Sequence, residues 1–149
     1  MRVLLVCSPG GHLQQMLALE PAWRGNERTW VTLPGADVSS LLKDEEVTLG
    51  HSPTNRSAKN LVRNAVLAWR LLRRRRPDAI LSTGAGLAVP FFLAGKLLGI
   101  RLVYVESVTR TESLSLSGRI VYPLADRFFV QWPRVAERFR RAEFAGAVL

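Results

Sequence analysis

The chain has 149 residues, of which 48% are hydrophobic and 22% are charged, and its formal net charge is +9. This length and composition suit one packed domain over residues 1–149 and exclude a disordered chain. A single cysteine, Cys7, excludes an internal disulfide framework and fits a reducing compartment. The excess of lysine and arginine favours a phosphate-rich partner, which can be nucleic acid, anionic lipid or a pyrophosphate substrate.

Apolar stretches of the sequence are short. The first, Val3 to Cys7, is too short for the core of a signal peptide and runs directly into Gly-Gly-His. The longest later stretch, "LAVPFFLAG", contains a proline and stops at Lys96, whereas a membrane span needs about 20 such residues. We therefore expect a cytoplasmic protein without a transmembrane segment of its own. Cys7 has no base-bearing motif beside it and is interpreted as a core residue.

Apolar runs alternate with helical patterns along the chain. The runs predict six strands, over 2–7, 28–33, 46–50, 78–83, 101–107 and 126–132. The segments between them predict helices over 12–23, 57–75, 84–99, 114–123 and 133–144, with Ser57 as an N-cap and Pro133 as a first helical residue. Such alternation implies an α/β fold, and runs this apolar imply a parallel sheet with helices on both faces.

The helix predicted from Ser57 carries much of the charge. At about 100° per residue, one face collects the apolar residues Leu61, Ala65, Ala68, Trp69 and Leu72. The opposite face collects the basic residues Arg56, Lys59, Arg63, Arg70 and Arg74, and no acidic residue lies between Arg56 and Arg76. A solvated face usually mixes both signs, so this basic stripe favours contact with an anionic membrane surface, while a plain solvated face remains the alternative.

Ligands of open parallel sheets bind beyond the carboxyl ends of the strands, and "SPGGHL" (8–13) follows the first predicted strand. Gly10 and Gly11 let the backbone approach an anion, and the helix that follows offers free N–H groups to a phosphate. His12 stands at the same helix end, where a neutral imidazole can accept a proton. A tight turn with an exposed histidine fits the same residues.

Two further loops follow predicted strands. "STGAGLAVP" (82–90) lacks the last glycine of a dinucleotide fingerprint, since Val89 stands there, but Gly84 and Gly86 still offer backbone to a polar ligand. The block "YVESVTRTESLSLSGRIVYPLADRFFVQW" (104–132) places Glu106 at a strand end with Arg110 after it. A structural pair between these two is the alternative to a role in a cleft. No metal-ligand spacing or cofactor motif occurs, so we expect neither a metal nor a cofactor.

The order of these three blocks resembles one family over nearly the whole chain. It is the family of acceptor-side, membrane-associating subunits of two-chain glycosyltransferases, which look like the MurG transferase split into two polypeptides and include PssD-like proteins of exopolysaccharide synthesis. The resemblance implies a Rossmann-like parallel sheet equivalent to the N-terminal half of a GT-B glycosyltransferase. The positions that match the family motifs are Gly10, Gly11, His12, Arg56, Gly84, Gly86, Pro90, Glu106, Arg110, Ser115, Ser117, Gln131 and Trp132.

The resemblance also implies a reaction. A UDP-sugar held by a partner subunit of the GT-B C-terminal type would donate its sugar, with inversion, to a polyprenyl-pyrophosphate-linked saccharide. This chain would bind that acceptor at the inner face of the cell membrane. Its pyrophosphate would lie against Gly10, Gly11, Arg56, Gly84, Gly86 and Arg110. His12, or else Glu106, would remove the proton from the acceptor hydroxyl. The expected membrane contacts are Lys59, Arg63, Arg70 and Arg74.

Two other functions remain open at this point. The chain can be a non-catalytic membrane anchor or activator of the partner transferase, with every reactive group on the partner. It can also be a basic nucleic-acid-binding module, although its arginine-rich face lacks the interleaved aromatic residues of a base-stacking platform, so we expect no nucleic acid. The last segment, "AEFAGAVL" (142–149), is expected either to dock on the partner or to fray.

Overall fold

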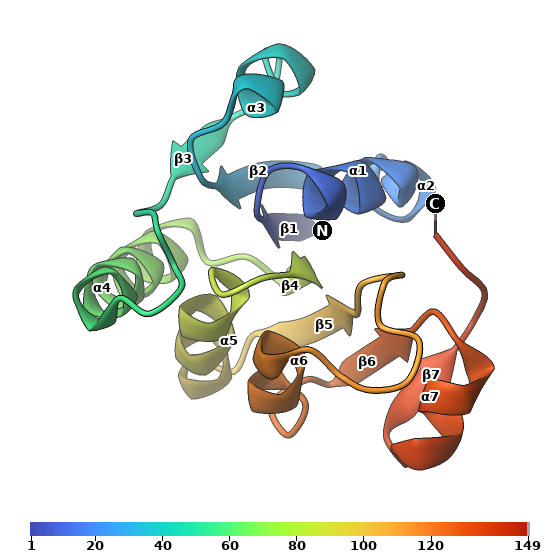
Figure 1. Ribbon diagram of the computed structural model, residues 1–149. Helices are drawn as coiled ribbons and strands as arrows, with labels where there is room; N and C mark the ends of the chain where they lie inside the picture. The colour runs from blue at the N-terminus through green and yellow to red at the C-terminus, as the bar shows by residue number, and fades with distance from the viewer. Residues whose placement is uncertain (149) are drawn as a thin grey trace.

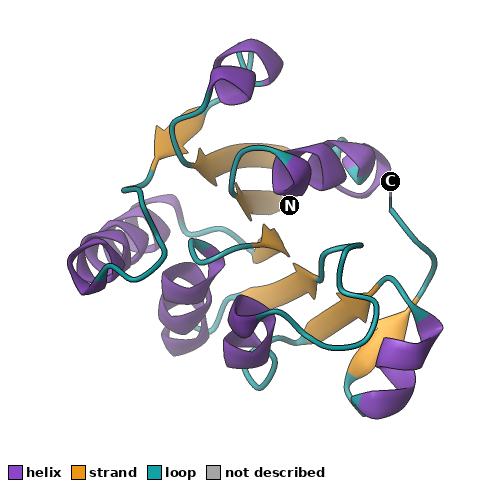
Figure 2. Cartoon of the chain, viewed as in Figure 1, coloured by secondary structure: helices purple, strands orange, loops and turns teal. Residues whose placement is uncertain are grey.

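The computed structural model describes residues 1–148, which fold around a seven-stranded parallel sheet (Figures 1 and 2). The strands lie in the order β3-β2-β1-β4-β5-β6-β7. Their bounds are β1 Arg2–Cys7, β2 Glu27–Thr32, β3 Val47–Leu49, β4 Ala79–Gly84, β5 Arg101–Val105, β6 Arg127–Val130 and β7 Ala142–Phe144. The predicted α/β class with a parallel sheet is confirmed, and all six predicted strands are present.

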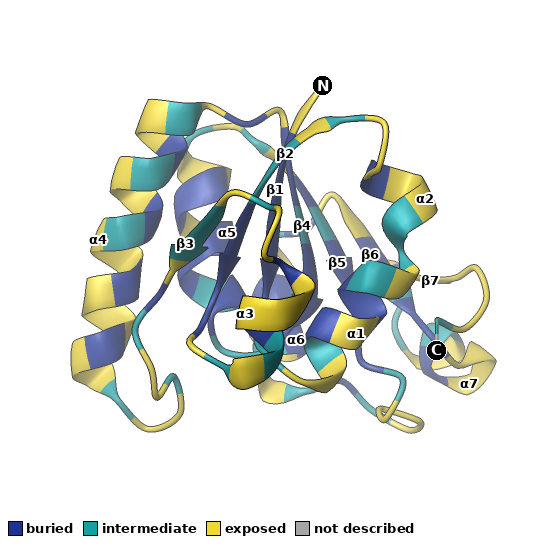
Figure 3. Cartoon of the chain, turned by 90° about the horizontal axis from the view of Figure 1, so that it is seen from above, coloured by how far each residue is buried: buried dark blue, intermediate teal, exposed yellow. Residues whose placement is uncertain are grey.

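Helices cover both faces of the sheet, as predicted (Figures 1 and 3). One face packs against α4 (Ala58–Arg75), α5 (Ala88–Leu97), α6 (Leu116–Val121) and α7 (Pro133–Arg138). The other packs against α1 (Gly11–Ala18), α2 (Glu20–Trp23) and α3 (Ala36–Leu41). Successive strand residues point to opposite faces, so Leu4 and Tyr104 enter the first core, and Leu5 and Trp30 the second.

Several predicted boundaries are wrong for identifiable reasons. The helix predicted over 12–23 is interrupted at Leu19, and Pro21 lies in the first turn of α2. The helix predicted over 133–144 ends at Arg138, and β7 follows it. There, pairing of Ala142 with Phe128 of β6 and burial of Ala142 outweigh local helix propensity. The helix α3 was not predicted at all.

The face that α4 turns toward the core differs from the predicted one. Ala68 and Leu72 are buried as predicted, but Leu61, Ala65 and Trp69 are exposed. Asn60 and Asn64 take their places, because their amides satisfy backbone groups of the preceding loop. Asn64 accepts from the N–H of His51 at 2.7 Å and donates to its carbonyl at 3.0 Å, and Asn60 donates to the Pro53 carbonyl at 2.9 Å. The expected basic residues, Arg56, Lys59, Arg63, Arg70 and Arg74, are all exposed.

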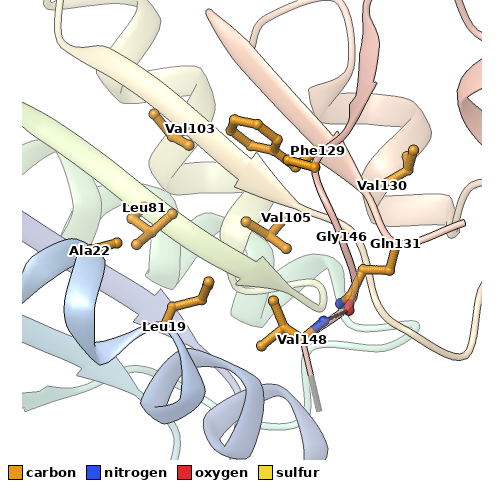
Figure 4. A pocket seen from close by; sticks show the side chains of 11 residues that line it. Leu19, Ala22, Leu81, Val103, Val105, Phe129, Val130, Gln131, Gly146 and Val148 are labelled. Carbon is orange, nitrogen blue, oxygen red and sulfur yellow. Dashed lines mark hydrogen bonds between the residues drawn. The ribbon is translucent and has the colours of Figure 1, made fainter.

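One part of the sheet lacks a helical cover. Beside α1 and α2, the side chains of Leu81, Val103, Val105 and Phe129 line an apolar cavity of about 270 Å³ (Figure 4). The segment 145–148 closes its far side, with the Val148 N–H donating to the Gln131 side chain. Within residues 1–148, no helix is both long enough and apolar enough to cross a membrane.

The strand order reverses between β1 and β4, where Cys7 is paired with Gly84. In folds of this kind the crevice at such a reversal is the usual place for a ligand. The loop after β1 carries Gly10, Gly11 and His12, and the loop after β4 carries Gly86. The topology therefore brings the first two predicted loops together.

Candidate active site

His12 is held at the carboxyl edge of the sheet by two hydrogen bonds to Thr83. Its ring atom Nδ1 lies 2.9 Å from the Thr83 carbonyl oxygen, and the Thr83 hydroxyl donates to the His12 carbonyl at 2.7 Å. Because a carbonyl only accepts, Nδ1 carries a proton, and in the neutral ring Nε2 is an acceptor. Nε2 has no hydrogen-bond partner among residues 1–148. The ring is thus oriented with one nitrogen available to take a proton.

Gly84 lies directly beneath this ring. Its φ is +120°, and a Cβ there would lie 3.0 Å from Cε1 of His12 and 3.1 Å from the Tyr104 hydroxyl oxygen. Any side chain would displace the imidazole. The structure therefore brings together His12 and Gly84, which the sequence analysis placed at one site, and the absence of a side chain at Gly84 leaves room for the imidazole.

The glycine loop after β1 is partly occupied by a carboxylate that the sequence analysis missed. Gly10, with φ +83°, donates its N–H to Oδ2 of Asp37 at 2.7 Å. Asp37 is the second residue of α3, and the only signal in the sequence was the "PGAD" that follows β2. The N–H groups of Gly11, His12 and Leu13 have no acceptor among the described residues, and α1 has no side-chain cap. These three groups, rather than the Gly10 N–H, can face an anion.

Glu106 is buried, with only 1% of its surface exposed, and both of its carboxylate oxygens are occupied. Oε1 accepts the N–H of Ser107 at 2.9 Å, and Oε2 accepts the N–H of Ser115 at 2.9 Å. The Ser115 hydroxyl also donates to both oxygens, and it caps α6 by accepting the Gly118 N–H at 2.9 Å. The carboxylate therefore joins the two ends of the 107–115 loop.

Two other residues of this block brace the same loop. The amide of Gln131 donates to the Glu106 carbonyl at 2.9 Å, and the indole of Trp132 donates to the Val108 carbonyl at 2.6 Å. Gln131 also donates to Gln15, a residue of α1 that the sequence analysis did not single out. Gln131 thus fastens the loop after β5 to the helix that carries His12, and Trp132 holds the same loop to the end of β6.

Arg110 and Arg56 lie at the surface. The Arg110 side chain is exposed, and within residues 1–148 it forms no ion pair with Glu106, so the structural pair considered as an alternative is absent there. Arg56 has φ +53° and lines a groove together with Gly86 and Ser117. The two arginines are therefore free to meet a ligand, but neither contacts His12 through a hydrogen bond.

Tyr104 is a further polar residue beneath the site. It is fully buried, and its hydroxyl makes no hydrogen bond within residues 1–148. Burial, with a smaller contribution from the charge of Glu106, raises the pKa of Tyr104 well above its ordinary value. Its hydroxyl consequently stays protonated beside Gly84.

Comparisons of the sequence with known proteins identify one family. Residues 36–148 match the family model described as "Oligosaccharide biosynthesis protein Alg14 like". The "UDP-N-acetylglucosamine transferase subunit ALG14" of Eremothecium gossypii is 42% identical over 127 residues, which cover 77% of this chain and 55% of that protein. The protein of the same name from Debaryomyces hansenii is 31% identical, over 99% of this chain and 76% of the relative. The chain thus spans about half the length of the first relative and three quarters of the second.

Solved structures share the fold. MurG of Acinetobacter baumannii superposes with a TM-score of 0.76 at 20% identity, over 99% of this chain and 45% of that chain. UDP-N-acetylglucosamine 2-epimerase from Rickettsia bellii gives a TM-score of 0.76 at 14% identity, again over 99% and 45%. The Rossmann-like, GT-B-type architecture expected from the sequence is therefore confirmed.

Proposed function

This chain belongs to the Alg14-like family of oligosaccharide biosynthesis proteins, and we propose that it is the acceptor-binding subunit of a heteromeric, inverting glycosyltransferase. The reaction moves a sugar from a UDP-sugar to a saccharide linked to a polyprenyl pyrophosphate. The names of the relatives, UDP-N-acetylglucosamine transferase subunits, support N-acetylglucosamine as the transferred sugar. Because these relatives are named as subunits, we infer a second chain, which binds the nucleotide sugar.

The observation that carries the proposal is the orientation of His12. With Nδ1 donating to the Thr83 carbonyl, Nε2 takes the proton of the acceptor hydroxyl while that oxygen attacks the anomeric carbon of the UDP-sugar. UDP leaves from the opposite side, so the configuration inverts. The Thr83 carbonyl continues to accept from Nδ1 when the ring becomes charged, which stabilises the imidazolium.

The acceptor pyrophosphate lies, in this proposal, against the free N–H groups of Gly11, His12 and Leu13, with Arg56 and Arg110 as counter-charges. Glu106 acts as a positioning residue, because its oxygens are already taken by Ser107 and Ser115.

The surface of α4 supports attachment to the membrane. Its exposed basic residues, Lys59, Arg63, Arg70 and Arg74, stand beside the exposed apolar residues Val62, Val66 and Trp69. A surface that mixes cations with apolar side chains suits the anionic cytoplasmic leaflet of a membrane. We therefore propose peripheral attachment there, through α4.

The role of His12 is tested by assaying His12→Ala together with the partner subunit. We expect kcat to fall by about 10²–10⁴-fold, the range for loss of a general base, with the KM for the UDP-sugar little changed. Gln14→Ala, at an exposed position of the same helix, is the matched control. Full activity of His12→Ala would remove His12 as the base and leave Glu106 or a group of the partner subunit to take that role. Turnover of the nucleotide sugar by this chain alone would contradict the two-subunit proposal.

Membrane attachment is tested with Arg63→Glu combined with Arg70→Glu. Flotation with vesicles that contain anionic phospholipid should be lost, since each basic residue contributes about 1 kcal/mol near such a surface. Filter binding of DNA, measured on the same proteins, separates this proposal from the nucleic-acid alternative. Unchanged flotation alongside tight, salt-sensitive DNA binding would overturn it.

A further inference from the structure

An open groove of about 890 Å³ lies between α4, α5 and α6. Figure 1 shows these three helices side by side on one face of the sheet. The apolar part of the groove is formed by Leu61 of α4, Val89 of α5, and Leu116 and Ile120 of α6. Leu61, Leu116 and Ile120 are exposed by 48%, 75% and 42%, which leaves a large apolar surface without a partner among the described residues. Such a surface indicates a binding site.

The groove begins beside the candidate active site. Gly86 lines it and stands two residues after Gly84, which lies under the His12 ring. Leu116 follows Ser115, the residue that Glu106 holds in place. The loops after β4 and β5 therefore contribute both to the site and to the groove.

The lining also contains polar groups, most of them on the 54–57 loop. Arg56, Ser57 and Ser117 line the groove together with Gly86, and Arg56 is exposed and cationic. A Cβ on Gly86 would come within 3.0 Å of Oγ1 of Thr54, so the absence of a side chain there lets the 54–57 loop pack against the loop after β4. The complementary ligand is a molecule that is apolar over most of its length and anionic at one end.

We propose that this groove binds the first isoprene units of the polyprenyl acceptor, with Arg56 against the pyrophosphate. The inference rests on the proposed function and adds to it the site of the lipid chain. A free phosphate compound would leave Leu116 and Ile120 unused. A flat bilayer surface would contact the outward side of α4 rather than a groove walled by three helices. Burial of the chain draws the pyrophosphate toward the N-terminus of α1 and fixes the distance between the acceptor sugar and His12.

The test compares farnesyl diphosphate with inorganic pyrophosphate, which has no apolar part, in binding to the full chain measured by calorimetry. We expect farnesyl diphosphate to bind at least about tenfold more tightly, because the groove buries its apolar carbons. Leu116→Ser should reduce the affinity for farnesyl diphosphate by about tenfold and leave that for pyrophosphate unchanged. Leu97→Ser is the matched control, because Leu97 is exposed by 78%, close to the 75% of Leu116, and lies outside the groove. It should change neither affinity.

The outcomes separate the two proposals. Equal affinity for both probes, or equal effects of Leu116→Ser and Leu97→Ser, overturns the groove and leaves the proposed function standing. Failure of both probes to bind overturns the proposed function and the groove together. If Leu116→Ser weakens binding to anionic vesicles while farnesyl diphosphate binding is unchanged, the groove is a bilayer contact and the proposal is overturned. A photoreactive prenyl diphosphate should label residues 116–120 in the unmodified chain, and labelling confined to other segments also contradicts the inference.

Discussion

His12 and Glu106 stand at comparable places in the fold, each just beyond the carboxyl end of a parallel strand, yet their surroundings differ. The imidazole is fixed through one nitrogen and has the other free, whereas both oxygens of the carboxylate are occupied by groups of its own loop. The sequence made both of them candidate bases, because a strand end indicates which residues can reach a crevice. Hydrogen-bond occupancy, which is visible only in the folded chain, distinguishes a group that can react from a group that holds a loop.

Glu106→Gln gives the largest expected effect and tests this difference directly. Oε1 and Oε2 each accept a backbone N–H, so the amide NH₂ of glutamine faces a backbone donor in either orientation. We expect the free energy of unfolding to fall by about 2–4 kcal/mol, measured by urea denaturation, although the volume of the side chain is conserved. Activity per folded molecule should fall less than it does in His12→Ala.

Glu112→Gln is the matched control, because it makes the same replacement in the same loop. Glu112 pairs with Arg134 while 62% of its side chain is exposed, and such pairs contribute little. Its stability should therefore change by less than about 1 kcal/mol. If Glu106→Gln were as stable as Glu112→Gln and yet inactive, Glu106 would be the base and the comparison with His12 would be reversed.

Gly118→Ala gives the next largest effect, and its sign is informative. In a helix this replacement ordinarily stabilises, by about 0.5–1 kcal/mol. At Gly118, however, a Cβ would overlap Oε2 of Glu106 and lie 3.0 Å from the Ser115 hydroxyl oxygen. We expect a loss of about 1–3 kcal/mol in thermal or urea unfolding, because the carboxylate must leave its donors. Gly11→Ala, where a Cβ meets nothing within 4 Å, is the control and should not destabilise. A stabilised Gly118→Ala protein would show that the Glu106 network is loose.

Much of the fold follows from the alternation of apolar runs and turns, and the exceptions have physical causes. The central strands β1 and β4 are buried on both faces over most of their length, so their hydrophobic pattern is strong. The strand β7 is three residues long and depends on its pairing with β6, which local sequence does not encode. The buried face of α4 was misassigned because Asn60 and Asn64 bind loop backbone, an arrangement that hydrophobic periodicity does not detect.

As with the fold, one part of the candidate site could be predicted from the sequence and another part could not. The glycines and His12 could be singled out because their residue types and their place after strands are distinctive. Thr83 and Asp37 were missed because they act through bonds to segments distant in sequence. Thr83 is 71 residues from His12, and Asp37 is 27 from Gly10. In the sequence, the apolar pattern identifies Thr83 only as a residue of a strand and does not indicate its bond to His12.

Thr83→Val tests the support of His12 with a smaller expected effect. The replacement keeps the branched shape and the carbonyl that orients Nδ1, but it removes the hydroxyl that donates to the His12 carbonyl at 2.7 Å. Loss of one such bond costs about 1 kcal/mol, so kcat should fall by about fivefold, with the KM for the UDP-sugar unchanged. Ser82→Val would not be a matched control, because the buried Ser82 hydroxyl accepts the Gly84 N–H. Thr29→Val, which makes the same replacement on strand β2, serves instead. Equal kcat in both variants would show that the ring needs no support from the hydroxyl.

Asp37→Asn gives the smallest expected effect and acts in the opposite direction. Its carboxylate accepts the Gly10 N–H and places a negative charge in the loop that we propose to face the acceptor pyrophosphate. Burial is the main cause that raises the pKa of the Cys7 thiol to about 12, and the charge of Asp37 is a second, smaller cause. The amide oxygen of asparagine can keep the bond to Gly10 while removing the charge, so the affinity for inorganic pyrophosphate should rise by about two- to fivefold, an increase that shrinks as salt is added. Calorimetry at two salt concentrations measures both effects. A lower affinity of Asp37→Asn for pyrophosphate would show that the Asp37 carboxylate is needed to shape the loop after β1. The free N–H groups of α1 would then not be sufficient to define the anion site.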